Sequence, residues 1–84
     1  MPYQVRISKK ALKVLEKIRD PDYSRIKNAI YSLANDPRPH GYKKLKGRNG
    51  YRIRIGNYRV IYEVLDSILL VDVLNLGDRK DIYE

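Results

Sequence analysis

The chain has 84 residues and carries 18 Lys and Arg against 10 Asp and Glu, a formal net charge of +8. This length suits one small domain, residues 1–84, which buries roughly 60% of the surface that its unfolded chain exposes. The absence of cysteine excludes disulfides and thiolate metal sites. The positive charge favours an anionic partner: nucleic acid, an acidic protein segment or an anionic membrane surface.

Targeting and cofactor signals are missing from the sequence. The N-terminus lacks the apolar core of a signal peptide, and no apolar run approaches the ~18 residues of a membrane span. Together with the lack of cysteine, this predicts a soluble, cytoplasmic protein. No His, Asp or Glu cluster has metal-ligand spacing, and no phosphate-binding loop motif occurs. We therefore expect neither a metal nor a small-molecule cofactor.

The first half of the chain changes from strand to helix spacing. Residues 3–7 alternate apolar and polar side chains, which predicts a short strand. Ser8 is a suitable N-cap for a helix that runs to about residue 19, and Pro21 suits the first turn of a second helix. The proline-rich residues 36–41 end that helix. The apolar stripes expected in the core are Ala11, Leu12, Leu15 and Ile18 on the first helix, and Ile26, Ala29, Ile30 and Leu33 on the second.

The second half of the chain predicts strands. We expect them at residues 42–46, 51–55, 58–65 and 68–76. Gly56-Asn57 is a two-residue hairpin signal between the second and third of these, and Asp66-Ser67 turns the chain into the last. The last segment is nearly continuously apolar, which predicts a central strand covered on both faces for much of its length.

The order β-α-α-β-β-β predicts an α+β domain. We expect a two-helix hairpin packed on one face of a mostly antiparallel four-stranded sheet. The other face of the sheet then stays open. In so thin a domain, an open face with charged rows is a candidate binding surface.

Basic side chains concentrate in residues 42–62, which contain no Asp or Glu. Tyr51, Ile53 and Ile55 point to one face of their strand, and Arg52 and Arg54 point to the other. Closing the hairpin brings Arg59 near these two arginines, and three adjacent positive charges repel one another unless an anion lies on them. The pattern predicts a phosphate-binding face. The residues expected to bind RNA are Lys43, Lys44, Lys46, Arg48 and Arg52. For the four that precede the strand, contact with the rRNA backbone and a solvated basic loop are equally good interpretations.

Tyrosine is the only aromatic residue type in the chain apart from His40, since Phe and Trp are absent. The tyrosines that can pack are therefore expected to be core aromatics rather than a platform for stacked bases. They are Tyr3, Tyr23, Tyr31, Tyr51, Tyr58 and Tyr62. Tyr83, near the C-terminus, is the exception and is a candidate for contact with a base.

Several segments together resemble a known family. They are Leu45-Lys46-Gly47, Tyr51-Arg52-Ile53-Arg54-Ile55, Asn57-Tyr58-Arg59-Val60-Ile61-Tyr62 and Leu76-Gly77-Asp78-Arg79-Lys80-Asp81-Ile82-Tyr83. In this combination and order the chain resembles the RelE/ParE superfamily of bacterial and archaeal toxins, and the RelE branch in particular. The resemblance implies a metal-free endoribonuclease that cleaves mRNA in the ribosomal A site and inhibits translation. Its implied partners are the ribosome (rRNA), mRNA and a cognate antitoxin.

The resemblance also implies roles for individual residues. Arg59, Arg79 and Tyr83 fall on the strand arginine, the tail arginine and the near-terminal tyrosine of the family. Arg52 and Arg54 fall where the family often has two lysines. We therefore expect Arg54, Arg59, Arg79 and Tyr83 to be catalytic.

The two arginines at lysine positions change the expected chemistry. A lysine is the family's proposed general base, whereas arginine stays protonated and cannot readily accept the proton of a 2′-hydroxyl. His40, the only histidine, lies in the proline-rich loop and is a weak substitute. Glu63 shares a strand face with Arg59 by parity, which favours a structural ion pair. The pattern supports RNA positioning better than it supports proton transfer.

Two other functions stay open at this point. The first is a ParE-like protein that poisons DNA gyrase through a protein interface and cuts nothing. The second is a basic RNA-binding domain without catalysis. A strong salt dependence would identify electrostatic docking on nucleic acid, because each phosphate contact releases counterions.

Overall fold

The computed structural model describes residues 2–47 and 49–78. These residues form two α-helices, five strands and a short 3₁₀ turn. In chain order the elements are β1 (Gln4–Ile7), α1 (Lys9–Glu16), α2 (Asp22–Ser32), β2 (Lys43–Lys44), β3 (Gly50–Ile55), β4 (Tyr58–Leu65), η1 (Asp66–Ile68) and β5 (Leu70–Asp78).

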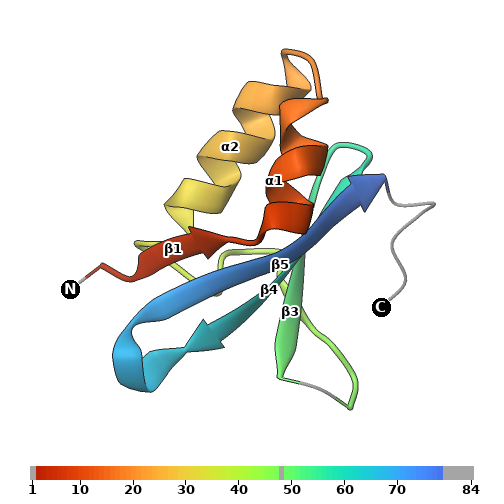
Figure 1. Cartoon of the computed structure of the whole chain (residues 1–84). Coiled ribbons are helices and arrows are strands. Elements are labelled where there is room, and N and C mark those ends of the chain that lie inside the picture. Colours follow the sequence, from red (N-terminus) through yellow and green to blue (C-terminus); the bar gives the residue numbers. More distant parts are fainter. Residues whose placement is uncertain (1, 48, 79–84) are drawn as a thin grey trace.

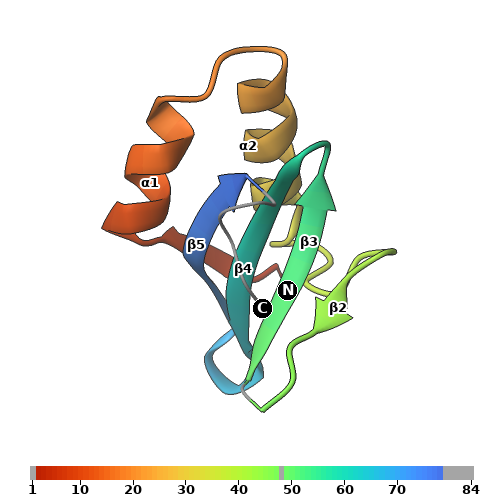
Figure 2. The same ribbon diagram turned by 90° about the vertical axis from the view of Figure 1, so that its right-hand side faces the viewer.

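The strands form one sheet in the order β1-β5-β4-β3-β2. β1 is parallel to β5, and all other neighbours are antiparallel. Both helices pack on the same side of the sheet (Figures 1 and 2), and in Figure 2 strands β3, β4 and β5 lie in front of α2. The predicted α+β class is confirmed. The predicted count of four strands is wrong, because the two-residue β2 adds a fifth at the edge.

Local sequence explains where the helices begin and end. The Ser8 hydroxyl caps α1 by accepting a hydrogen bond from the Ala11 amide (3.1 Å). It also donates to the Leu74 carbonyl (2.9 Å), which ties the helix start to β5. α1 ends at Glu16, earlier than predicted. The amides of Lys17 and Ile18 donate to the carbonyls three residues back, those of Val14 and Leu15 (3.1 Å each), so the last turn tightens and the α-helical pattern stops. Neither helix in the described ranges is long and apolar enough to cross a membrane.

The core lies between the helices and the sheet. The predicted members Leu15, Ile26, Ile30 and Leu33 are buried there with Val60, Tyr62, Val71, Val73 and Leu76. Leu12 and Tyr31 are predicted core residues that are 41% and 51% exposed. Each directly follows a buried helix residue and is therefore turned by 100° away from the centre of the apolar stripe. Of the six tyrosines predicted to pack, Tyr62 is fully buried and Tyr3, Tyr23, Tyr51 and Tyr58 pack against the core.

β5 has the predicted central position, between β1 and β4. It begins at Leu70, two residues later than expected, because η1 and a left-handed Leu69 (φ 52°) complete the turn from β4. Val71 and Val73 are buried against the helices, whereas Asp72 on the opposite face is half-buried. The sheet face opposite the helices is therefore only partly covered.

Candidate nucleic-acid interface

The strand register places the central arginines together. Arg54 lies directly opposite Arg59, and Arg52 is the diagonal neighbour of Arg59 because it pairs with Ile61. All three are on the sheet face opposite the helices, since Ile53 and Val60, the paired residues between them, belong to the core. We call this surface the arginine face and define it by Lys43, Arg52, Arg54 and Arg59. The predicted convergence of Arg52, Arg54 and Arg59 is confirmed.

The three arginines differ in their exposure. Arg54 is exposed, Arg59 is half-buried and Arg52 is only 3% exposed. Like charges directly opposite each other on neighbouring strands destabilise a sheet, and removing a cation from water costs free energy as well. An anion bound between the arginines would reduce the repulsion. The partly dry surroundings would strengthen its attraction to them.

A small apolar cluster beside Arg52 was not predicted from the sequence. Leu45 and Ile61 are buried together, separately from the main core. Ile61 lies between Arg59 and Glu63 on the face of β4 that otherwise carries charged side chains. An apolar residue at such a position was the sequence signal that could have predicted this cluster. The Leu45 amide donates to the Gly50 carbonyl (2.9 Å) and closes the loop that follows β2. The cluster and this loop help to exclude water around Arg52.

The predicted RNA-contacting lysines divide between the two sides of the sheet. Lys43 pairs with Arg52 and Lys44 pairs with Tyr51, so Lys43 belongs to the arginine face and Lys44 lies on the other side. Successive strand residues point to opposite faces, so the two lysines cannot both contact RNA from the arginine face. Lys46 is exposed in the loop after β2.

Three predicted site residues, Arg48, Arg79 and Tyr83, lie outside the described residues. The end of β5 is nevertheless informative. Gly77 pairs with Arg59, and β5 ends one residue later at Asp78. The last described residues of β5 therefore lie beside Arg59, which is itself paired with Arg54.

The residues weighed as substitute bases lie away from the centre of the arginine face. Within the described chain Glu63 forms no ion pair, so the predicted pair with Arg59 is wrong. The two residues lie four positions apart along β4, roughly 13 Å of strand. His40 is exposed and lines a hollow between α2 and the edge of β3, together with Leu33, Ile53 and Arg54.

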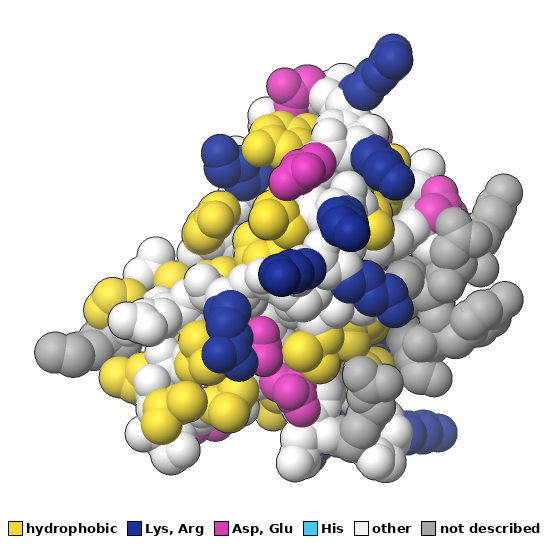
Figure 3. All heavy atoms as spheres, in the orientation of Figure 1, with side chains coloured by type: hydrophobic (Ala, Val, Ile, Leu, Met, Phe, Trp, Pro, Cys, Tyr) yellow, Lys and Arg dark blue, Asp and Glu magenta, His cyan; other side chains and the backbone are white. Residues whose placement is uncertain are grey.

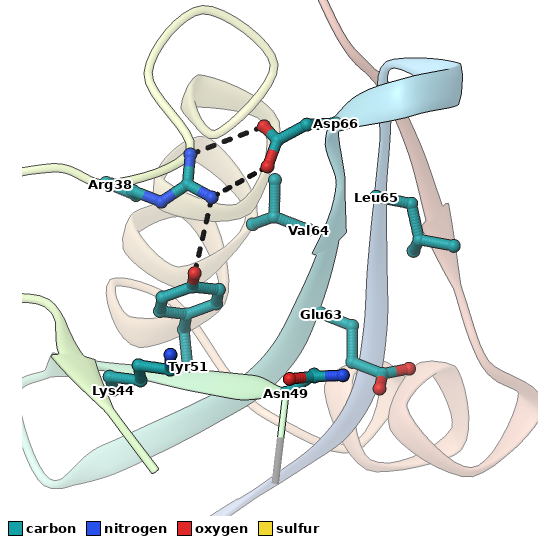
Figure 4. A pocket seen from close by; sticks show the side chains of 8 residues that line it. All are labelled: Arg38, Lys44, Asn49, Tyr51, Glu63, Val64, Leu65 and Asp66. Atoms are coloured by element: carbon teal, nitrogen blue, oxygen red, sulfur yellow. Dashed lines mark hydrogen bonds and ion pairs between the residues drawn. The ribbon is translucent and has the colours of Figure 1, made fainter.

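A second hollow, which we call the edge hollow, lies beside β2 and the first residues of β3 (Figure 4). It has a volume of about 340 Å³ and is lined by Arg38, Lys44, Asn49, Tyr51, Glu63, Val64, Leu65 and Asp66. Arg38 Nη2 donates to Asp66 Oδ2 (2.9 Å) and to Tyr51 Oη (3.2 Å). The Tyr3 hydroxyl donates to Asp66 Oδ1 (2.5 Å). This network joins residues that are far apart along the chain, and no sequence pattern predicts it.

The ion pair predicts a pH effect on stability that Asp66→Asn should remove. Hydrogen bonds from Arg38 and then Tyr3 hold the pKa of Asp66 below its usual range. A carboxyl with a lowered pKa in the folded state stabilises the fold above its unfolded pKa of about 3.9, and this contribution is lost as the pH falls through the folded pKa. We expect the variant to be less stable than the parent at pH 7 in urea denaturation, with the difference shrinking below about pH 4.

Glu16→Gln is the matched control for this measurement, because Glu16 is exposed and forms no ion pair in the described chain. It should change stability little at either pH. A difference between Asp66→Asn and the parent that stays constant from pH 7 to the acid range would contradict the assignment.

Comparison with known proteins connects this fold and surface to a family. The family described as "ParE toxin of type II toxin-antitoxin system, parDE" matches residues 5–83. A protein from Methanocaldococcus jannaschii that is named as toxin RelE1 is 32% identical over 88 residues, which cover 100% of this chain and 98% of that protein.

Two solved structures show the same architecture. The archaeal RelE–RelB complex from Pyrococcus horikoshii contains a chain with a TM-score of 0.85 and 32% identity, covering 98% of this chain and 100% of that one. The intact RelBE toxin–antitoxin complex from E. coli gives a TM-score of 0.78 and 26% identity, covering 90% of this chain and 95% of that one.

Proposed function

The chain belongs to the RelE/ParE family of type II toxins, and from this premise we propose that it cleaves mRNA in the ribosomal A site and so inhibits translation. The observation that carries the proposal is the arginine face. Arg54 and Arg59 are cross-strand neighbours on the sheet face opposite α1 and α2, with the buried Arg52 diagonal to Arg59. Such an arrangement suits a phosphate group better than it suits a protein core.

The reaction that fits these groups needs no metal. The ribose 2′-oxygen attacks the adjacent phosphorus in line, the bond from phosphorus to the 5′-oxygen breaks, and a 2′,3′-cyclic phosphate remains. Negative charge grows on the non-bridging oxygens in the transition state, where guanidinium groups held in place stabilise it more than in the ground state. We assign this role to Arg54 and Arg59. Arg79 and Tyr83 are added on the resemblance alone, as a further cation and as a residue that stacks on a base or transfers a proton.

Proton removal from the 2′-hydroxyl is the weak step of this mechanism. Arginine remains protonated at neutral pH, and the described arginine face offers only Lys43 besides three arginines. His40 lies in the hollow on the helix side of β3 and stays outside the proposed catalytic set. We infer that catalysis rests mainly on positioning and on charge stabilisation, with the ribosome supplying part of the geometry.

The charge distribution fits a large polyanionic partner. Basic side chains extend beyond the arginine face: Figure 3 shows Lys and Arg spread over the side of the molecule that carries α1. Lys9, Lys10 and Lys13 are exposed on that helix. A surface that is positive on several sides accelerates association with rRNA at low ionic strength.

A cognate antitoxin is the second proposed partner. The relatives from P. horikoshii and E. coli were solved as complexes with RelB antitoxins. An open basic sheet face suits a disordered acidic segment that folds as it binds. The toxin should therefore be difficult to express alone and should co-purify with the product of the adjacent gene.

The proposed activity predicts ribosome-dependent cuts. Protein added to a translating extract should produce new mRNA 5′ ends within the A-site codon and should reduce protein synthesis, whereas naked mRNA should stay intact. Primer extension maps these ends. Unchanged translation without A-site ends would contradict the proposal.

The ParE name of the matching family makes gyrase the second candidate target. The same extract experiment is therefore paired with a supercoiling assay. Gyrase-linked DNA breaks without mRNA cuts would assign the protein to the gyrase poisons. RNA binding without either reaction would leave a non-catalytic binding domain.

A further inference from the structure

The sheet face that carries the arginines changes its charge along β4. Past Arg59 comes the uncharged Ile61, which pairs with Asn75, and two positions further comes Glu63, directly opposite Asp72 on β5. Both carboxylates lie on this face, because the residues before and after them on their strands pack in or against the core: Tyr62, Val64, Val71 and Val73. We call Glu63 and Asp72 the acidic row.

A cation beyond the acidic row is already bound to a carboxylate. Arg6 on β1 lies opposite Asp72. Its Nε donates to Asp72 Oδ1 (3.2 Å) and its Nη2 donates to Asp72 Oδ2 (2.9 Å). The Asp72 side chain is only 15% exposed, so this two-pronged pair lies partly out of water. A guanidinium held in this way is less available to a phosphate than the exposed Arg54 is.

The stability of the sheet does not explain the acidic row. Like charges directly opposite each other on neighbouring strands are unfavourable. Arg6 compensates Asp72, whereas Glu63 forms no ion pair among the residues that the structure describes. Figure 4 shows its carboxylate pointing away from Arg38 and Tyr51. A ligand on this face therefore explains the row better than sheet packing does.

The acidic row repels a phosphate only over part of the face. Glu63 lies roughly 7 Å of strand from Ile61 and roughly 13 Å from Arg59. The Debye length is about 8 Å at physiological ionic strength. A phosphate at Ile61 is therefore repelled, and one held beside Arg54 and Arg59 is largely screened from the row.

A course across the strands meets no carboxylate of the acidic row. Arg54 on β3 pairs with Arg59 on β4, which pairs with Gly77 on β5. Gly77 has no side chain that would obstruct an RNA backbone at this point. Lys43 on β2 pairs with Arg52 and continues the positive charge to the edge of the sheet. From β2 to β5 this course is about 15 Å wide.

We propose that the acidic row sets the course of RNA on the arginine face. The RNA crosses the strands in the line of Arg54, Arg59 and Gly77 and does not follow β4 past Ile61. The carboxylates of the row repel the phosphates of the alternative course, and Asp72 keeps Arg6 occupied. The inference rests on the proposed function only in that the arginine face holds RNA; it does not require cleavage.

Salt-dependent binding of uridine oligomers to the isolated protein tests the inference. Fluorescence anisotropy gives the slope of log affinity against log salt for oligomers of increasing length. The four cations of the arginine face contact at most about four phosphates, so the slope should level off near about −3 beyond about five nucleotides. Arg54→Gln should make the slope shallower by about 0.7, the share of one phosphate contact. Arg6→Gln removes the same charge from the same face and should leave the slope unchanged.

Neutralising the acidic row should lengthen the bound RNA. Glu63→Gln combined with Asp72→Asn removes the repulsion and releases Arg6, so the slope should steepen by about 0.7 and level off at a longer oligomer. Adding Arg6→Gln to this pair should restore the slope of the parent. Glu16→Gln is the matched control for Glu63→Gln, because it removes one exposed carboxylate from α1 and should not change the length at which the slope levels off. Thermal melting confirms that each variant is folded.

Two results would overturn the inference. One is a slope that falls as much in Arg6→Gln as in Arg54→Gln. The other is a levelling length that stays at the parent's value when both carboxylates of the acidic row are neutralised. An unchanged slope in Arg54→Gln would instead contradict the premise that the arginine face holds RNA. The expected slopes without A-site cuts on ribosomes would contradict only the proposed cleavage.

Discussion

Replacing Arg59 by Ala is expected to lower the rate of mRNA cleavage on the ribosome by about 10²–10³-fold, the usual effect of removing one donor to a charged transition state. Arg59 is the residue that the register places between Arg54 on β3 and Gly77 on β5. Its half-buried guanidinium acts where water is partly excluded, so its charge is screened less than that of a surface lysine. Single-turnover cleavage of mRNA on stalled ribosomes measures the effect directly.

Two further variants show whether the loss of cleavage rate in Arg59→Ala comes from losing the guanidinium geometry or only from losing a positive charge. Arg59→Lys keeps the charge but loses the planar, bidentate fork, so its rate should lie between those of the parent and Arg59→Ala. Lys10→Ala removes one charge from exposed α1 and should stay within about threefold of the parent, as a surface charge contributes mainly to association. If Lys10→Ala and Arg59→Ala had equal rates, the arginine face would not be the catalytic surface.

The arginine face could be predicted because it depends on local rules. Alternation in β3 and β4 separates the arginines from the core residues, and Gly56 has the positive φ (59°) that a two-residue hairpin turn needs. Once that turn is fixed, the pairing of Arg54 with Arg59 follows by counting outward. The same reasoning identified the Ser8 cap and the central position of β5.

The edge hollow could not be predicted in this way. Its ion pair joins Arg38 in a loop to Asp66 after β4, which are 28 residues apart and show no mutual signal in sequence. β2 has only two residues, too few for an alternation pattern, so its division of Lys43 from Lys44 depends on pairing with β3. The burial of Leu45 with Ile61, the partner of Arg52 on β4, likewise depends on the loop after β2.

Tyr62→Ala is expected to be the most destabilising single substitution in the sheet, with a loss of about 3–5 kcal/mol in the free energy of unfolding, as for other large aromatic residues removed from cores. Tyr62 is fully buried, its ring stacks on Tyr51, and its hydroxyl donates to the Pro37 carbonyl (2.7 Å). Since 1 kcal/mol corresponds to roughly 4–8 °C in a domain of this size, the Tm should fall by more than about 12 °C.

Tyr62→Phe separates the ring from its hydroxyl. Burial raises the pKa of the Tyr62 phenol, so the group remains a protonated donor across the neutral range. Removing it leaves the Pro37 carbonyl without this donor and should cost about 1–3 kcal/mol. That hydrogen bond anchors the loop that carries Arg38 and His40 to β4. Tyr31→Ala is the matched control, because Tyr31 is an exposed tyrosine on α2; its free energy of unfolding should stay within about 0.5 kcal/mol of the parent's. If thermal melting showed Tyr62→Ala to be equally mild, β4 would not be the centre of the core. The register that brings Arg54 and Arg59 together would then lose its main support.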